Sequence, residues 1–158
     1  FRVVPGVSAG TGGLAGAGIP VTHRGIGQAV TFVTGHGAAG HPPQGVDWAA
    51  LAQASPTLVL FMALARLQEI VPALLAAGRS SDEPVAFVSH ASTARQVCTT
   101  TTLAQALEAA AGLDRSAPTL IVVGPTVALQ ATLAGWQDTV PATLAVPAVE
   151  PVPRAAGT

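Results

Sequence analysis

The sequence predicts an α/β fold with a mixed sheet. Short β-branched and aliphatic runs bounded by Gly and Pro alternate with segments whose apolar residues recur at helical spacing. After Gly45 the order of strands and helices favours a mixed sheet. The 158 residues suffice for one good-sized domain or two small ones, and an apolar fraction of 49% supports a packed core.

The first 45 residues are expected to hold two strands around a glycine-rich helix. Phe1–Val4 is typical of a short strand. Ser8 is expected to cap a helix that runs to about Ala17, although each glycine within it costs about 1 kcal/mol relative to alanine. Ala29–Val33 is the second expected strand. Gly35–Gly45, rich in Gly, Pro and His, is expected to be an exposed loop or a boundary between lobes.

The rest of the chain supplies the other expected elements. Strands are expected over Thr57–Phe61, Pro84–Ser89, Val97–Thr101 and Thr119–Val123. Helices are expected from a cap at Asp47 to Ala52, over Leu64–Ala77 and over Leu103–Ala111. Pro72 is expected to bend or break the second of these helices, which ends at Gly78. Residues 131–158 lack periodicity and are expected to form a Pro/Ala-rich tail, disordered or linking.

Composition excludes several classes of protein. The seven basic residues are all Arg and are scattered, and the net charge is −1, so no nucleic-acid surface is expected. No apolar run reaches the ~18–20 residues that a membrane span needs, and the start of the chain lacks a secretory signal. We therefore expect a cytoplasmic protein without a membrane partner. For the single cysteine, Cys98, a buried structural thiol is favoured over a nucleophile.

Two patterns could indicate a different kind of site. Gly10–Ala15 matches the G-x-G-x-x-A dinucleotide fingerprint, but the expected strand before it is short and no acidic residue follows about 20 positions later. The four histidines are His23, His36, His41 and His90. Because their spacing matches no compact ligand pattern, structural or substrate-facing roles are favoured and no metal site is expected.

Seven sequence blocks occur in a fixed order and cover most of the chain. They are Val3–Ala9 (VVPGVSA), Ala17–Arg24 (AGIPVTHR), Val30–His36 (VTFVTGH), Asp47–Ala52 (DWAALA), Thr57–Met62 (TLVLFM), Thr93–Gln96 (TARQ) and Pro118–Gly124 (PTLIVVG). Each block alone is a weak signal. In this order the set resembles the uroporphyrinogen-III C-methyltransferases of the tetrapyrrole methylase family.

The resemblance implies a tetrapyrrole methylase fold, with S-adenosylmethionine bound between two α/β lobes. Residues 1–36 would then be the remainder of the N-terminal lobe, 37–46 the inter-lobe loop and 47–130 the C-terminal α/β lobe. The implied reaction is transfer of two methyl groups to ring carbons of uroporphyrinogen III, giving precorrin-2 for sirohaem and cobalamin synthesis, with S-adenosylhomocysteine as the second product. Family members are commonly homodimers, so a homodimer is expected.

The resemblance also implies residues that contact the cofactor. Ser8 and Ala9 stand at the turn before the first helix, and Met62 follows the strand over Thr57–Phe61. Ala91 stands where the family usually has Gly, and Thr119 is expected beside the adenine. Without the resemblance, plain core packing would be favoured for Met62.

The substrate has eight carboxylates, so arginines in the cleft are expected to bind it. Arg24 is the first candidate, with His23 beside it and Arg95 third. The alternative for each is a solvated surface charge or a hydrogen bond that holds the fold. Thr22 and His36 are expected to organise the lobe junction.

The chain departs from the family pattern in several places. The family usually has Tyr where Gly16 stands, and Gly where Ala63 and Thr101 stand. Its Gly/Pro-rich N-terminal loop and G-G-D-P segment would lie before Phe1, so we expect a C-terminal part that is inactive alone, with catalytic residues unknown. The alternatives are a later precorrin C-methyltransferase and a non-catalytic remnant or interaction module.

Overall fold

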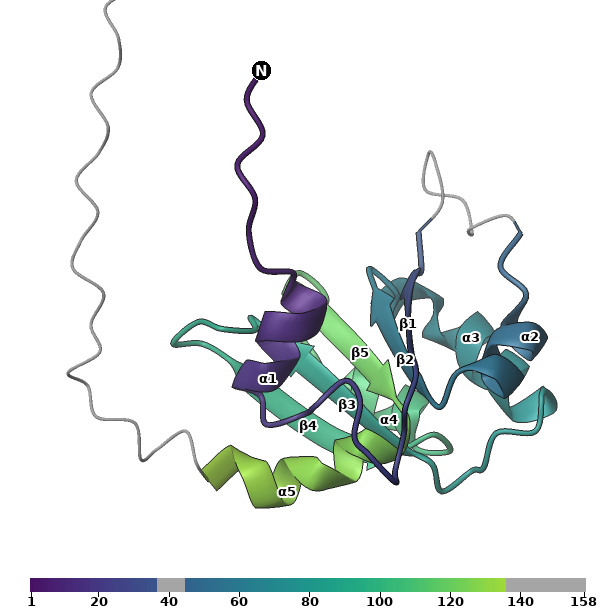
Figure 1. The fold of residues 1–158 in the computed structure, drawn as a ribbon. Helices are drawn as coiled ribbons and strands as arrows, with labels where there is room; N and C mark the ends of the chain where they lie inside the picture. Colours follow the sequence, from purple (N-terminus) through teal and green to yellow (C-terminus); the bar gives the residue numbers. More distant parts are fainter. Residues whose placement is uncertain (37–44, 136–158) are drawn as a thin grey trace, which may run out of the picture.

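The computed structural model describes residues 1–36 and 45–135, which build a five-stranded sheet with helices on both faces (Figure 1). The strands lie in the order β1 (Val30–Thr34), β2 (Thr57–Phe61), β5 (Thr119–Val123), β3 (Pro84–Ser89) and β4 (Val97–Thr102). β1 is parallel to β2, whereas β5 is antiparallel to β2 and β3, and β4 is antiparallel to β3. The predicted α/β fold with a mixed sheet is confirmed.

The directions of the strands decide which residues meet at an edge. Since β5 is antiparallel to both β2 and β3, these two strands run the same way, as does β1. The carboxyl ends of β1, β2 and β3 therefore lie at one edge of the sheet, together with the first residues of β5. Segments that are far apart in the sequence converge at this edge.

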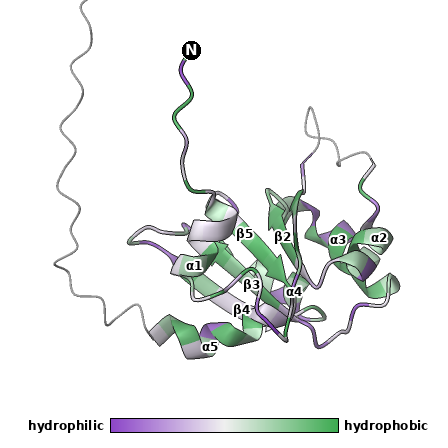
Figure 2. Ribbon diagram, viewed as in Figure 1, coloured by the Kyte–Doolittle hydropathy of each residue, from purple (hydrophilic) through white to green (hydrophobic). Residues whose placement is uncertain are grey.

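Alternation along the buried strands sends side chains into two cores. Leu58 and Leu60 of β2 face a core shared with Phe87 of β3 and with the helices α2 (Trp48–Ala54), α3 (Leu67–Ala76) and α4 (Ala106–Ala111). Val59 faces the opposite core, which Leu14 and Ile19 cover. Figure 2 shows the resulting apolar colouring along the central strands. Both faces of the sheet are thus buried.

The glycine-rich helix lies unusually close to the second face of the sheet. It consists of a π-helical turn, Ala9–Gly13, continued by α1 (Leu14–Gly16). A Cβ added to Gly10 would stand 2.6 Å from the Phe32 ring, and one added to Gly13 would stand 2.8 Å from the Ala91 Cβ. Close contact with β1 and with the loop after β3 therefore accounts for Gly10 and Gly13.

The two predicted helix caps are confirmed. The Ser8 Oγ accepts a hydrogen bond from the Gly10 N–H at 3.2 Å, and the Asp47 Oδ1 accepts one from the Ala50 N–H at 2.9 Å. A 3-10 turn over Leu64–Arg66 precedes α3, which continues through Pro72 without a break.

Two expectations differ from the structure. Phe1–Val4 is not a strand: Val3 and Val4 are 77% and 79% exposed, and no strand of the described residues pairs with them. Helical structure continues past the point where periodicity fades, as a 3-10 turn over Pro125–Leu129 and as α5 (Gln130–Leu133). Residues 37–44, which hold most of the expected inter-lobe loop and His41, and residues 136–158 of the expected tail lie outside the described part of the chain.

One sheet joins residues that were expected to lie in two lobes. Every residue of β1 pairs with a residue of β2, and Leu14 packs against the same sheet. Residues 9–36 therefore belong to the same sheet and core as residues 47–130, because β1 completes the sheet beside β2. The described residues hold no helix that is long and apolar enough to cross a membrane.

A buried ion pair lies at the opposite edge of the sheet, where β2 and β3 begin. The Arg79 guanidinium, 5% exposed, donates to the Glu83 carboxylate at 2.5 Å and to the backbone carbonyls of Ser55 and Pro56. Burial raises the pKa of Glu83 above its ordinary value of 4.5, although the Arg79 charge and hydrogen bond act in the other direction. Arg79 thus links the segments that enter β2 and β3.

Candidate functional site

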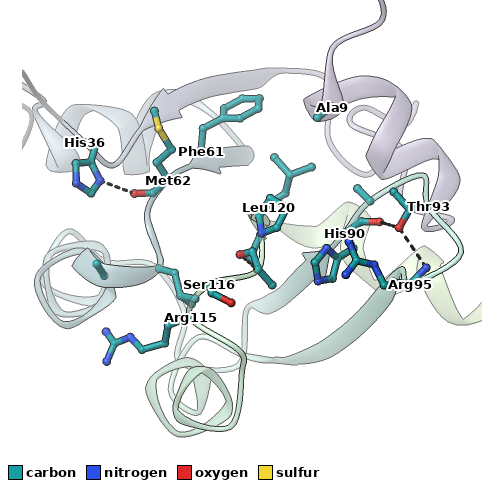
Figure 3. Close-up of a pocket in the computed structure, with 16 residues that line it drawn as sticks. Ala9, His36, Phe61, Met62, His90, Thr93, Arg95, Arg115, Ser116 and Leu120 are labelled. Atoms are coloured by element: carbon teal, nitrogen blue, oxygen red, sulfur yellow. Dashed lines mark hydrogen bonds between the residues drawn. The ribbon is translucent and has the colours of Figure 1, made fainter. Parts of the chain in front are cut away.

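A cleft of about 900 Å³ opens at the edge where β1, β2 and β3 end (Figure 3). Its lining comes from the segments that follow these strands, from the loop before β5 and from Ala9. Apolar side chains, among them Phe61, Met62, Leu64 and Leu120, supply much of the wall. A concave, mostly apolar site with a few polar groups is typical of small-molecule binding.

Met62 leaves β2 in an unusual backbone conformation. Its φ is 51°, in the left-handed region that non-glycine residues rarely adopt, and its side chain is 63% exposed and lines the cleft. The Met62 carbonyl accepts a hydrogen bond of 3.2 Å from the His36 Nδ1 (Figure 3). This exposure excludes plain core packing for Met62, the alternative that the sequence left open.

The loop after β3 forms another wall of the cleft. His90 and Ser92 have φ of 49° and 61°, and the His90 N–H donates to the Pro118 carbonyl at 3.0 Å. Gln96 fastens the loop, since its Oε1 accepts from the Ser92 N–H at 2.7 Å and its Nε2 donates to the Gly16 carbonyl at 2.9 Å. Gln96, part of the TARQ block, therefore ties this loop to α1.

The loop before β5 is held by side-chain hydrogen bonds. The Asp114 Oδ1 accepts from the Ser116 N–H at 2.8 Å and from the Ser116 hydroxyl at 2.7 Å. The Thr119 hydroxyl donates to the Ala117 carbonyl at 3.1 Å and so accepts from the Ser89 hydroxyl at 2.8 Å. The proton of the Thr119 hydroxyl is thus used within the protein, which leaves its backbone as the group offered to a ligand.

Strand alternation directs the backbone of Thr119 toward the cleft. The Pro118 carbonyl accepts a hydrogen bond from the His90 N–H, and the Gly124 N–H donates to β3, so the even-numbered residues of β5 direct their backbone groups toward β3. The backbone groups of the odd-numbered residues of β5 therefore face β2. The pairing of Leu60 with Ile121 places Met62 opposite Thr119. Because Met62 has turned away from the sheet, the N–H and C=O of Thr119 face the space at the end of β2.

The structure gathers most of the residues expected to bind the cofactor. Ala9, Met62, Ala91 and Thr119 all line the cleft. Ser8 precedes Ala9 and caps the helix that carries it.

The structure separates the residues expected to bind substrate. Arg95 lines the cleft, but His23 and Arg24 do not. The His23 N–H bonds to the Gly27 carbonyl at 2.7 Å, and Gly27 lies against Pro56 and Thr57 at the start of β2. His23 and Arg24 thus lie one strand length from the cleft, roughly 17 Å for five residues.

Several cleft residues, among them Phe61, Leu120 and Arg115, were not singled out as binding residues from the sequence. His90, for which only a structural or substrate-facing role was expected, lines the cleft as well. A positive φ at a non-glycine residue such as His90 has no sequence signal, and Arg115 stands in a loop without periodicity. Among the described residues no three His, Cys, Asp or Glu side chains form a group that could hold a metal ion.

Cys98 lies away from the cleft on β4. It is half-buried and packs against the core that contains Val88. Burial raises the pKa of the Cys98 thiol above its ordinary value of 9.0, which keeps it protonated near neutral pH. This agrees with a structural thiol rather than a nucleophile.

Because of Asp114, the loop before β5 is expected to lose stability at acidic pH. The hydrogen bonds from Ser116 lower the pKa of Asp114 below its ordinary value of 3.8. A lowered pKa contributes stability that is present above pH 3.8 and is lost as the pH falls through the folded-state value. We expect Asp114→Asn to lower the melting temperature slightly at about pH 6 and not at about pH 2, in thermal melts across that range. If Asp114→Asn lowered the melting temperature equally at about pH 6 and at about pH 2, this role of the carboxylate would be contradicted.

Comparisons of the sequence and of the fold with known proteins identify the same protein family. The family model of the tetrapyrrole (corrin/porphyrin) methylases matches residues 1–107. The chain is 51% identical over 135 residues to a uroporphyrinogen-III C-methyltransferase from Sinorhizobium sp., covering 84% of this chain and 48% of the relative. It is 46% identical over 139 residues to siroheme synthase 2 of Aeromonas hydrophila, covering 87% of this chain and 28% of that protein. The chain therefore spans about half the length of the first relative and less than a third of the second.

A solved structure also resembles the fold. The uroporphyrin-III C-methyl transferase of Thermus thermophilus, complexed with S-adenosylhomocysteine, superimposes with a TM-score of 0.68 at 34% identity. The match covers 81% of this chain and 54% of that one. Since the family model matches 107 of the 158 residues, the chain belongs to the tetrapyrrole (corrin/porphyrin) methylase family.

Proposed function

We propose that this chain is part of an S-adenosylmethionine-dependent methyltransferase that converts uroporphyrinogen III to precorrin-2. The observation that carries the proposal is the cleft, which brings Ala9, Met62, Ala91 and Thr119 together from four separate segments. The Thermus relative that shares this fold is complexed with S-adenosylhomocysteine. A C-methylation of a tetrapyrrole is also what the name of the Sinorhizobium relative describes.

The chemistry of the cleft fits an adenosyl group. Thr119 presents one backbone donor and one acceptor beside an apolar wall of Met62 and Leu120, which suits the edge and the faces of an adenine ring. Ala91, which lines the cleft, also packs against Gly13, so the helix that carries Ala9 is held close to the ligand. When bound, S-adenosylmethionine supplies a methyl group already activated by a sulfonium. The residues of this chain bind and orient the cofactor and exclude water from it.

Two arginines are placed to bind the carboxylates of a tetrapyrrole. Arg95 and Arg115 both line the cleft, in the loops after β3 and before β5. The Arg95 backbone is held by the Thr93 hydroxyl at 3.2 Å, and Arg115 lies between the hydrogen-bonded Asp114 and Ser116. We therefore assign carboxylate binding within this chain to these arginines, in place of His23 and Arg24. Guanidinium groups suit this task because they offer several donors to one carboxylate.

The site is tested by titrating the full-length protein that contains this chain with S-adenosylhomocysteine. We expect the unmodified protein to bind. We expect Met62→Ala to raise the dissociation constant about five- to thirtyfold, because the lost apolar contact with the ligand weakens the binding free energy by about 1–2 kcal/mol. The alanine keeps the Cβ of the original residue, so the conformational cost at φ 51° does not change. Val97→Ala is the control, since Val97 is 55% exposed on β4 and does not line the cleft.

The outcomes separate the proposal from its alternatives. Absence of binding to the unmodified protein would contradict cofactor binding and favour a non-catalytic remnant or interaction module. An unchanged dissociation constant for Met62→Ala would remove Met62 from the site. Methyl transfer to uroporphyrinogen III distinguishes this enzyme from a later precorrin C-methyltransferase, which would act only on a substrate that is already methylated.

The assembly and the pathway belong to the same proposal. We infer a cytoplasmic homodimer whose product feeds sirohaem and cobalamin synthesis, with the remaining half of the enzyme supplying catalytic groups. The siroheme synthases among the relatives support the sirohaem branch. Size-exclusion chromatography with light scattering tests the dimer, and a methyl-transfer assay on the 158-residue chain alone is expected to show no activity.

A further inference from the structure

The tripeptide Thr34-Gly35-His36 lies directly beside the turn at Met62, where β1 and β2 end together. We propose that His36 is a positioning residue, which draws the Met62 carbonyl away from β5 and so opens the backbone of Thr119 to the cofactor. This inference rests on the proposed function, because it assigns a role in cofactor binding.

Strand pairing shows what His36 changes. If β2 continued regularly, Met62 would pair with Thr119, and the Met62 carbonyl would accept the hydrogen bond of the Thr119 N–H. Instead, Met62 has φ of 51° and its carbonyl accepts from the His36 Nδ1 at 3.2 Å, on the side of β1 (Figure 3). The Thr119 N–H therefore faces the cleft, where a ligand acceptor can bind it.

The same tripeptide holds the residues on both sides of Met62. The Gly35 N–H donates to the Phe61 carbonyl at 2.7 Å, so two successive carbonyls of the turn accept hydrogen bonds from the end of β1. A Cβ on Gly35 would lie 2.6 Å from the Ala63 Cβ and would also overlap the Ala63 backbone. Glycine at this position thus allows the close approach that brings His36 within reach of Met62.

The orientation of His36 is itself fixed. The Thr34 hydroxyl donates to the His36 carbonyl at 3.1 Å and accepts from the His36 N–H at 3.3 Å. Because a carbonyl can only accept, the His36 Nδ1 carries the proton of the bond to Met62. A left-handed backbone at a residue with a side chain persists only where the surroundings hold it, and these contacts supply that restraint.

The geometry of this bond allows a sharp set of variants. His36→Asn retains a donor at the position of Nδ1, His36→Gln places its donor one bond farther out, and His36→Ala removes it. We expect the Ala and Gln variants to raise the dissociation constant of S-adenosylhomocysteine about tenfold in calorimetry of the full-length protein. The Asn variant should stay within about twofold of the unmodified protein, which a role limited to filling space would not produce. Equal affinities for the unmodified protein and His36→Ala, or for the Asn and Gln variants, would overturn the proposal.

A second readout does not depend on cofactor binding. Met62 is the only methionine of the 158 residues, so a ¹³C-methyl methionine label reports on this turn alone in NMR spectra of the chain. We expect the methyl resonance to move and broaden in His36→Gln and to keep its position in His36→Asn. If the unmodified protein does not bind S-adenosylhomocysteine, the proposed function fails, while an unchanged resonance in His36→Gln is the result that contradicts the positioning role.

Discussion

Replacing Arg79 with Leu is expected to lower the free energy of unfolding by about 3–5 kcal/mol, the largest effect of any single substitution considered for this chain. Arg79 is 5% exposed and Glu83 is 14% exposed, so the variant leaves a buried carboxylate without its cation. The backbone carbonyls of Ser55 and Pro56 lose their donor as well. Such a loss is a large share of the ~5–15 kcal/mol that stabilises an ordinary domain. Urea denaturation followed by circular dichroism measures it.

The pH dependence of this variant tests its physical cause. Without Arg79, the pKa of Glu83 in the folded state rises further above its ordinary value of 4.5. A raised pKa costs stability as the pH rises, so the penalty of Arg79→Leu should be larger at about pH 7 than at about pH 4. The double variant Arg79→Leu/Glu83→Leu should recover part of the loss, because it removes the unpaired charge.

Arg66 provides the matched control for Arg79. It forms an ion pair with Glu69 at 2.9 Å, with the two side chains 25% and 58% exposed. Solvated pairs of this kind contribute little, so Arg66→Leu should cost less than about 1 kcal/mol. If Arg79→Leu and Arg66→Leu lowered the free energy of unfolding by similar amounts, the buried pair would contribute no more to stability than the surface pair.

Replacing Gly124 with Ala is expected to cost about 2–4 kcal/mol, the second-largest effect. Gly124 follows β5 with φ of 148°, a conformation that side chains rarely adopt. An added Cβ would overlap the Pro56 carbonyl oxygen and stand 3.0 Å from the Thr57 Cα, and these are backbone atoms that cannot rotate away. The start of β2 must therefore shift, which a lower melting temperature would report.

The variant Gly78→Ala separates the conformational cost of an added Cβ from its steric cost. Its φ is 94°, but an added Cβ meets no atom within 4 Å. Gly78→Ala therefore reports the conformational cost alone, which we expect to be about 1 kcal/mol. If Gly124→Ala lost no more stability than Gly78→Ala, the steric argument at Pro56 would be wrong.

Much of the fold could be predicted from the sequence because local signals and burial agree in the chain after Gly45. The segments Thr57–Phe61, Pro84–Ser89 and Thr119–Val123 are apolar and bounded by turn residues, and each is a strand with the expected bounds. The place of β1 in this sheet could not be predicted, because a strand pattern does not tell which strand lies beside it. Phe1–Val4 shows the same limit, since β-branched residues form a strand only where a partner is available.

The candidate site was predictable only as far as the family blocks reach. Ala9, Met62 and Thr119 belong to those blocks and meet at one cleft, together with Ala91, which stands where the family usually has Gly. The contact of His36 with Met62 could not be predicted, because it joins residues 26 positions apart through a backbone carbonyl, which leaves no trace in residue types. His23 and Arg24 show a second limit: a charged block in a family motif does not tell at which end of the strands it lies.

The residues that stabilise the sheet and the residues that line the cleft lie at opposite ends of the central strands. The buried ion pair lies where β2 and β3 begin, and the cleft lies where they end, roughly 17 Å away for a five-residue strand. Substitutions at such distances usually act independently. Substitutions of the cleft-lining side chains Arg95 and Arg115 are therefore expected to leave the contribution of the Arg79–Glu83 ion pair to stability unchanged.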